Sequence, residues 1–251
     1  MNTQKWGSGS LVILALAGVG CKGGLPSKQK EVELGQQFAQ EYEQKLPDGP
    51  IVTRGPEYER VQRVAAKLLP LARKDWDVPY TVKVIQSDQI NAFAVPGGPI
   101  YFYTGLIKLA ANDDELASVL GHEIAHITKR HSVKQMKKSQ DMMIGLAAID
   151  VLIKGGNTVK GAAEIAAGLQ QMKFSRGDEN QADEFGFKYL VNMNYNSDAM
   201  ASFFTKMGEK TGGNGGGRLG DFLSSHPMTN KRVEAATKRS TDFKKGNYKA
   251  P

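Results

Sequence analysis

"VLGHEIAHITKRH", residues 119–131, contains three of the four histidines in this chain. His122 and His126 are four residues apart, which places them one turn apart on the same face of a helix. Two imidazoles in that arrangement can bind one tetrahedral metal ion. Glu123 follows the first histidine, so its carboxylate can reach water on the metal without being a ligand. The stretch therefore matches H-E-x-x-H, which supplies two zinc ligands and a general base.

The residues beside the two histidines favour a helix that is buried behind a metal site. Asn112 or Asp113 can cap a helix over 113–131. A surface helix with coincidental histidines would carry charges in these flanks, whereas the flanking residues are uncharged: Val119, Leu120, Ile124, Ala125 and Ile127. His131 lies five residues after His126 and points elsewhere on such a helix. We interpret it as a solvated or dipole-compensating histidine near the helix end.

A catalytic zinc ion needs a third protein ligand and an open position for water. The longer H-E-x-x-H-x-x-G-x-x-H motif is absent, because lysine and serine stand where its glycine and third histidine would be. The strongest candidates are the acids of "FSRGDENQADEFGFKYL" (174–190). Glu179 and Asp183 share one face of a predicted helix, so one can bind the metal while the other supports it. Spacing alone does not choose between this pair and Glu184.

The fold class follows from the strand and helix signals. Residues 80–87 alternate as a half-buried strand does, and residues 91–105 hold two short β runs around a Pro-Gly-Gly-Pro turn, most simply a hairpin. Helical spacing is found at 26–46, 56–74, 113–131, 133–154, 158–173, 178–194, 197–210 and 229–239, with a flexible glycine-rich loop at 211–220. We expect one mostly helical α+β domain with a small β-sheet or hairpin beside a helical bundle.

"HEIAH" followed 53 residues later by "ENQAD" (179–183) resembles the H-E-x-x-H plus E-x-x-x-D pair of one gluzincin metallopeptidase family. That family includes HtpX, the CAAX prenyl endopeptidases, OMA, BepA and LoiP, and a compact LoiP-like lipoprotein metalloprotease is the member that the chain resembles most. The resemblance implies a zincin-type active-site helix and one zinc ion (Zn2+) per chain. It makes His122, His126 and Glu179 the ligands. Glu123 becomes the general base, with Asp183 supporting the ligands.

Two further segments carry the resemblance, which runs from about residue 30 to 240. "NAFAVPGG" (91–98) resembles the N-A-F-A-x-P-G-G segment of the family. It implies an edge strand that pairs with an extended polypeptide substrate and is formed by Asn91, Ala92, Phe93 and Ala94. "SSHPMTNKR" (224–232) resembles the late H-P…R motif. It implies that His226 donates a hydrogen bond to the transition state and that Arg232 is a supporting cation.

Both of these segments also admit a purely structural interpretation. The Pro-Gly-Gly segment can be no more than a hairpin turn. The His-Pro segment can be a loop before the last helix, which Thr229 or Asn230 would cap. Their order around H-E-x-x-H favours the functional interpretation.

The first residues predict a lipoprotein signal peptide at 1–20. Lys5 is followed by an apolar run and by "GVGC", which ends at Cys21, the only cysteine. Gly18 departs from the leucine that is usual three residues before such a cysteine, and a signal peptide with an incidental cysteine is the alternative. Because Lys22 is not aspartate, we expect an outer-membrane lipoprotein of the bacterial cell envelope that faces the periplasm. A linker at 21–29, a metallopeptidase domain at 30–240 and a basic tail at 241–251 complete the organisation.

Charge and motifs together limit the classes of function that the sequence allows. The formal net charge is +7, and the basic excess lies in 129–138 and in the tail from 231 to 249, where it serves as solvated helix faces or meets an anionic surface. No recognised nucleic-acid module accompanies it, so we expect no nucleic-acid partner. The sequence predicts a zinc-dependent endopeptidase for unfolded or damaged envelope proteins. The alternative is an assembly factor or chaperone that binds envelope assembly proteins and has a zinc site but little proteolysis.

Overall fold

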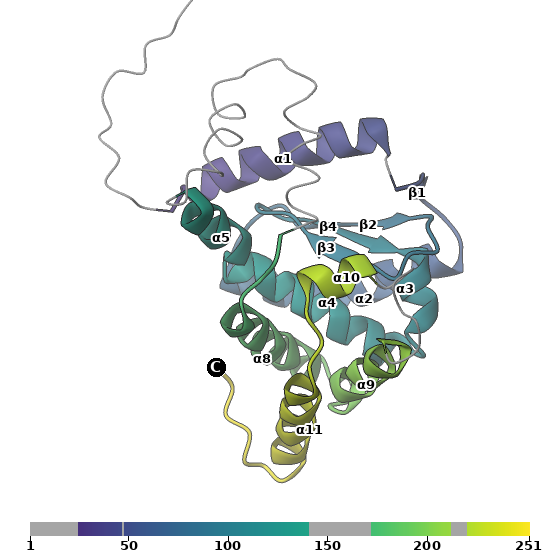
Figure 1. Ribbon diagram of the computed structural model, residues 1–251, viewed down its shortest axis with the longest axis vertical. Helices are drawn as coiled ribbons and strands as arrows, with labels where there is room; N and C mark the ends of the chain where they lie inside the picture. The colour runs from purple at the N-terminus through teal and green to yellow at the C-terminus, as the bar shows by residue number, and fades with distance from the viewer. Residues whose placement is uncertain (1–24, 47, 141–171, 212–219) are drawn as a thin grey trace, which may run out of the picture.

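The computed structural model describes residues 25–46, 48–140, 172–211 and 220–251 (Figure 1). The predicted signal peptide, Cys21, residues 158–171 of the predicted helix 158–173 and residues 212–219 of the predicted loop lie outside these residues. So does the part of the predicted helix 133–154 that follows residue 140. The described helices and strands confirm a mostly helical α+β fold with a small sheet.

The elements follow one another in a simple order. The strands are β1 (Ile51–Val52), β2 (Thr81–Ile85), β3 (Ala92–Ala94) and β4 (Pro99–Tyr103). The helices before residue 141 are α1 (Lys28–Lys45), α2 (Pro56–Asp75), α3 (Thr104–Leu109), α4 (Asp113–Thr128) and α5 (His131–Gln140). Those after residue 171 are α8 (Arg176–Asn192), α9 (Ala199–Thr211), α10 (Gly220–Ser225) and α11 (Asn230–Lys244).

The sheet has the order β1-β2-β4-β3, so β3 lies at an edge, as the sequence predicts. β3 and β4 pair as the expected antiparallel hairpin, whereas β2 and β4 are parallel. The turn between β3 and β4 contains Gly97 and Gly98, whose φ angles of 82° and 130° lie in the region that favours glycine. The predicted Pro-Gly-Gly turn therefore has a physical requirement for its two glycines.

The side chains of β4 alternate between two hydrophobic cores, as a period of two residues requires. Ile100 and Phe102 belong to the large core, which α2, α4, α8 and α9 share with the sheet. Tyr101 and Tyr103 point to the other face, where they pack with α1 residues in a small aromatic core. The sheet is thus a layer between α1 on one face and the helices of the large core on the other (Figure 1).

α4 is the central helix, and each of its residues from Glu115 to Thr128 is buried. Of the two predicted caps, Asn112 is the one that accepts a hydrogen bond from Glu115 N, at 3.0 Å. The helix ends at Thr128 and does not continue to residue 131, because Arg130 adopts a left-handed conformation with φ of 60°. A new helix, α5, then begins at His131.

α4 and α8 approach each other closely at two glycines. A β-carbon added to Gly186 would lie 2.9 Å from His122 N, and one added to Gly121 would lie 2.9 Å from Gly186 O. Real side chains do not approach backbone atoms so closely, so both positions require glycine. This contact brings the acids of α8 beside the histidines of α4.

The sequence did not predict three short elements: β1, α3 and α10. β1 is two residues long and α3 and α10 are six residues each, which is too short for hydrophobic periodicity to show. Within the part of the chain that the structure describes, no helix is both long enough and apolar enough to cross a bilayer.

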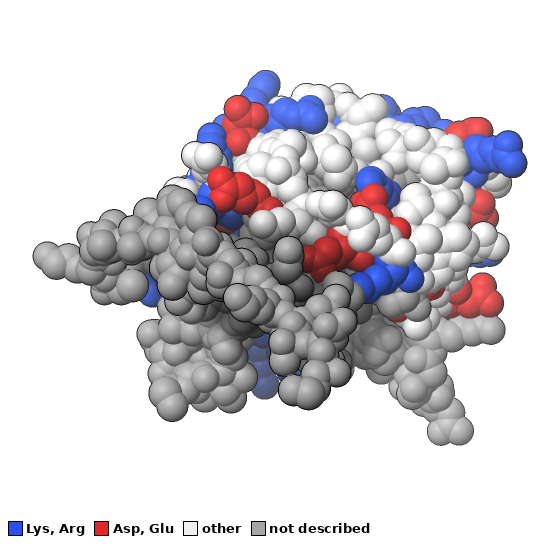
Figure 2. All heavy atoms as spheres, turned by 90° about the horizontal axis from the view of Figure 1, so that it is seen from above, with Lys and Arg blue, Asp and Glu red and all other residues white. Residues whose placement is uncertain are grey.

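The side of the molecule on which α1 lies carries charges of both signs. Figure 2 shows Lys and Arg side chains interspersed with Asp and Glu around the described part of this face. Such a pattern is typical of a solvated surface and not of a basic patch.

Replacing Gly186 with alanine tests the glycine contact between α4 and α8. We expect Gly186→Ala to lower the free energy of unfolding by about 1–3 kcal/mol, because the new methyl group must push the two helices apart. Urea unfolding in the presence of a chelator measures this without a metal contribution.

Gly208→Ala is the matched control. Gly208 also lies in a helix, but nothing is within 4 Å of where its β-carbon would be. Alanine should stabilise the protein there by up to about 1 kcal/mol. An equal change in the free energy of unfolding at both positions would contradict a steric requirement for glycine at position 186.

Candidate metal centre

The two histidines of α4 form one wall of the site. His122 and His126 are 3% and 2% exposed, and their Nε2 atoms lie 3.0 Å apart. The spacing of four residues on a helix produces this convergence, as the sequence predicts. Two imidazole nitrogens that face each other at this distance indicate a position for a shared cation.

Glu179 on α8 forms the opposite wall. Its carboxylate oxygens lie 3.6 Å from His122 Nε2 and 3.5 Å from His126 Nε2. Glu179 lies in the first turn of α8, and the capping residue Ser175 forms a capping box with Asp178. Spacing had left Glu184 open as an alternative to this acid, and the structure brings Glu179 to the histidines.

Asp183 lies one turn after Glu179 and contacts the far side of His122. Its Oδ1 is 2.9 Å from His122 Nδ1. Because an ionised carboxylate only accepts hydrogen bonds, His122 carries its proton on Nδ1 and leaves the Nε2 lone pair free. This is the supporting position that the sequence predicts for Asp183.

Arg232 lies in the first turn of α11 and holds both acids. Its Nε and Nη2 donate to the two carboxylate oxygens of Asp183 at 2.8 and 2.7 Å, and its Nη1 lies 2.6 Å from Glu179 Oε2. Thr229 caps this helix by accepting from Arg232 N, so it is the cap among the two predicted candidates. The guanidinium is 5% exposed and lies over the Phe204 ring.

The acids respond to this environment in a consistent way. Burial acts to raise the pKa of Asp183, but the positive charge of Arg232 and the hydrogen bond from His122 outweigh it and the pKa is lowered. Burial likewise acts to raise the pKa of Glu179, and the imidazoles of His226 and His122 outweigh it, so that this pKa is well below its usual range. Both carboxylates are therefore ionised at neutral pH.

Glu123 behaves differently, because burial outweighs the effect of the nearby imidazoles on its pKa. It is 1% exposed, and burial raises the pKa of its carboxyl group above the usual value despite the nearby His226 and His122. The backbone N–H of Ala94 is its hydrogen-bond donor, and its Oε1 has no hydrogen-bond partner among the described residues. A buried oxygen without a partner has unused capacity to accept a proton from water or substrate.

His226 follows α10 and closes the site. Its Nδ1 is 3.0 Å from Glu179 Oε1 and 3.2 Å from His122 Nε2, while its Nε2 is 3.7 Å from Glu123 Oε1. Burial acts to lower the pKa of His226, but the carboxylates of Glu179 and Glu123 outweigh it and the pKa is raised. The structure thus brings His226 within reach of the metal position as well as of the general base.

The donor atoms fit a tetrahedral zinc ion. One ligand atom each from His122, His126, Glu179 and His226 lie within 4.8 Å of one another, and all four residues are buried. Two ligand atoms at about 2.1 Å from a tetrahedral zinc ion are roughly 3.4 Å apart. The separations of 3.0, 3.2, 3.5 and 3.6 Å given above are close to that value. Three imidazole nitrogens and one carboxylate oxygen are also donor types that zinc prefers.

The edge strand β3 runs beside this site. Ala92 is fully buried in the large core, Phe93 joins the aromatic core under α1, and Ala94 faces Glu123 through its N–H. Asn91 accepts a hydrogen bond from Tyr103 N through its carbonyl, at 3.0 Å. Among the described residues no further strand pairs with the outer edge of β3.

The sequence interpretation of His131 is wrong. The side chain is 1% exposed, and its Nδ1 lies 3.0 Å from His126 Nδ1. The left-handed residue before it turns the chain, so that the face on which His131 lies cannot be read from a continuous helix. Sequence reasoning also missed Gln181, which accepts from His131, and two aromatic rings on His226, those of Phe174 and Phe222.

Comparisons with known proteins agree with this geometry. The model of peptidase family M48 matches residues 57–240. A beta-barrel assembly-enhancing protease of Yersinia pestis is 30% identical over 175 residues, which cover 66% of this chain and 35% of that protein. Metalloprotease YcaL of Escherichia coli is 30% identical over 62% of this chain and 60% of its own length.

A third relative comes from a mitochondrion. Mitochondrial metalloendopeptidase OMA1 of Arabidopsis thaliana is 30% identical over 62% of this chain and 30% of its own length. The chain thus spans about a third of some relatives and three fifths of another. The matches confirm the resemblance to a gluzincin metallopeptidase family.

Removing Arg232 should reveal how much the two acids depend on it. We expect Arg232→Leu to lower the free energy of unfolding by about 3–5 kcal/mol, because two buried carboxylates lose their cation. The pKa of Asp183, which the charge of Arg232 lowers, stabilises the fold above the ordinary carboxyl pKa, and this contribution is lost as the pH falls through the lower folded value. The variant should therefore have a lower free energy of unfolding than the wild type at neutral pH, and this free energy should fall less as the pH is lowered. Urea unfolding in the presence of a chelator measures both effects.

Arg63→Leu is the control, since Arg63 also binds an aspartate, Asp113, but its side chain is 57% exposed. Exposed ion pairs contribute little to stability, so the free energy of unfolding should fall far less in this variant. An equal loss of unfolding free energy in both variants would contradict the role of Arg232 in compensating the two acids.

Proposed function

Because the chain belongs to peptidase family M48, we propose that it is a zinc-dependent endopeptidase that hydrolyses unfolded or damaged proteins of the bacterial cell envelope. The observation that carries this proposal is the buried Glu123 beside four side chains that could hold a metal ion, with one carboxylate oxygen that has no hydrogen-bond partner among the described residues. A purely structural metal site needs no such group.

His122, His126 and Glu179 would hold the zinc ion, which supplies Lewis acidity that polarises the scissile carbonyl and acidifies water. Glu123 takes one proton from water as the water oxygen bonds to the carbonyl carbon, and it delivers that proton to the amine nitrogen as the C–N bond breaks. The raised pKa of Glu123 suits the first step, because a more basic carboxylate accepts the proton more readily.

His226 has two roles open to it in this scheme. With both ring nitrogens protonated it can donate a hydrogen bond to the developing oxyanion, as the late sequence motif implies. Its Nδ1 also lies among the metal-binding atoms, and substrate binding then requires the imidazole to give up that position. Phe174 and Phe222 hold the ring by packing against it.

The outer edge of β3 supports a preference for extended chains. A peptide that pairs with this edge gains backbone hydrogen bonds whatever its side chains are. Ala94 is the strand residue next to Glu123, so such a peptide would pass directly over the general base. Backbone recognition of this kind suits unfolded proteins, whose strands are free to pair.

Replacing Glu123 with glutamine should separate binding from hydrolysis. We expect Glu123→Gln to cleave an unfolded substrate such as casein about 10²–10⁴-fold more slowly, because general acid–base catalysis is lost. Zinc content, measured by metal analysis, should not change because Glu123 is not a ligand. Chelation of the wild-type protein should abolish cleavage, and zinc should restore it.

The same variant distinguishes the alternative, an assembly factor or chaperone with little proteolysis. Some relatives are named beta-barrel assembly-enhancing proteases, a name that joins both activities. If Glu123→Gln kept full cleavage with zinc bound, the enzymatic mechanism would be wrong. If the wild-type protein cleaved nothing but prevented aggregation of envelope proteins, the assembly role would replace the protease.

We further propose that Cys21 is lipidated and tethers the protein to the outer membrane, facing the periplasm. The apolar run before "GVGC" and the lysine after the cysteine support this. In a Gram-negative host, Cys21→Ser should abolish palmitate labelling and move the protein from the membrane to the soluble fraction. Lys22→Asp should keep the label but shift the protein to the inner membrane. An unlabelled wild-type protein would contradict the anchor.

A further inference from the structure

His131 is a buried histidine that the proposed mechanism does not use. It is the first residue of α5, immediately after the turn that ends α4, and it is 1% exposed. Its Nδ1 lies 3.0 Å from His126 Nδ1, and its Nε2 lies 3.0 Å from the amide oxygen of Gln181 on α8. It therefore connects a candidate metal ligand to a third helix.

The partners of His131 determine where its proton lies. An amide oxygen only accepts, so His131 Nε2 carries the hydrogen. The nearest carboxylate oxygen, on Asp178, is 3.8 Å from Nε2 and beyond hydrogen-bond distance. A buried imidazole with an amide and another imidazole as hydrogen-bond partners is neutral, since a buried charge needs a charged partner. Its Nδ1 then holds a lone pair that can accept.

The position of the proton on His131 also determines the position of the proton on His126. Because His131 Nδ1 accepts, His126 carries its proton on Nδ1 and donates it. The lone pair of His126 is then on Nε2, the atom that faces His122 Nε2 and Glu179. Both histidines of α4 thus present Nε2 lone pairs to one point.

We propose that His131 is a positioning residue, which fixes the tautomer and ring orientation of His126 so that its Nε2 binds the metal. The proposal rests on the metal site of the proposed function. Asp183 does the same for His122, but with a carboxylate. A neutral partner for His126 adds no negative charge to a site that already holds three buried carboxylates.

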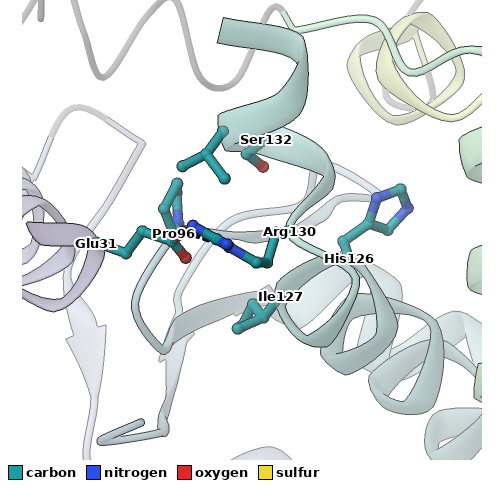
Figure 3. Close-up of a pocket in the computed structure, with 7 residues that line it drawn as sticks. Glu31, Pro96, His126, Ile127, Arg130 and Ser132 are labelled. Carbon is teal, nitrogen blue, oxygen red and sulfur yellow. Dashed lines mark hydrogen bonds and ion pairs between the residues drawn. The ribbon is translucent and has the colours of Figure 1, made fainter. Parts of the chain in front are cut away.

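The turn that places His131 is fixed from the side away from the metal site. Arg130 donates to the Glu31 carboxylate of α1 at 2.6 Å and to the backbone carbonyl of Pro26, and its guanidinium lies 5.0 Å from the centre of the Trp76 ring. Figure 3 shows Arg130 reaching towards Glu31, while His126 points away from both. The left-handed backbone at Arg130 is thereby held, and His131 is held with it.

Zinc affinity tests this role independently of activity. We expect His131→Leu to weaken zinc binding by about 10–100-fold, measured by competition with a chromophoric chelator. His131→Asn should restore most of the affinity, because the asparagine Oδ1 lies near the position of Nδ1 and can accept from His126. The absorption spectrum of the cobalt-substituted protein should change in His131→Leu and return towards that of the wild type in His131→Asn.

Tyr189→Phe is the control for the loss of a buried polar group. The Tyr189 hydroxyl donates to Asp75 and lies within hydrogen-bond distance of Thr128, and neither of these residues is a candidate ligand. The zinc affinity of Tyr189→Phe should equal that of the wild type even if this variant unfolds more easily. If His131→Leu fails to fold, Gln181→Leu takes its place, because it removes the acceptor that fixes the His131 proton and should also weaken zinc binding.

The outcomes separate this inference from the proposed function. Wild-type zinc affinity in His131→Leu or Gln181→Leu, or an asparagine variant as weak as the leucine variant, would overturn the role of His131 and leave the protease intact. A wild-type protein that binds no zinc would overturn both.

Discussion

Three carboxylates are buried within one small volume, and the rest of the site is arranged to compensate for them. Glu123, Glu179 and Asp183 are each at most 2% exposed. Arg232 supplies one positive charge, and a divalent metal ion would supply two, which balances three ionised acids. Without compensation, burial of this many charges would cost several kcal/mol for each ion. The charge balance therefore requires that α4, α8 and α11 meet, since each contributes one part of it.

Close helix packing makes that meeting possible. The glycines at 121 and 186 let α4 and α8 approach at backbone distance, and the acids of α8 lie within one turn or two of that contact. The same helix α4 carries Glu123 on a different side, towards the edge strand β3. One helix thus presents the candidate metal ligands to α8 and the proposed general base to the strand. This division explains why all of its residues from Glu115 to Thr128 are buried, which an amphipathic surface helix would not show.

Sequence patterns predicted the parts of the fold that repeat with a regular period. The spacing of His122 and His126, the hairpin around the glycines and the long helices that lie within the described residues all depend on neighbours in sequence, and they were found. The choice of Glu179 over Glu184 depends on how two helices pack, so spacing left it open and only the family resemblance selected it. Strand β1 and the helices α3 and α10 are too short to show a period.

His131 shows why a regular period fails where the chain breaks it. On a continuous helix, a residue five positions after His126 lies on another face, and this spacing led to the wrong interpretation. The chain instead ends α4 at Thr128 and begins α5 after a left-handed Arg130, a conformation that non-glycine residues rarely adopt. Partners distant in sequence, Glu31 and Trp76, hold that conformation. The local sequence therefore could not reveal it, because the interaction that decides the direction of His131 comes from α1 and α2. The aromatic core that fixes α1 on the sheet thus acts, through Arg130, on the orientation of a candidate metal ligand.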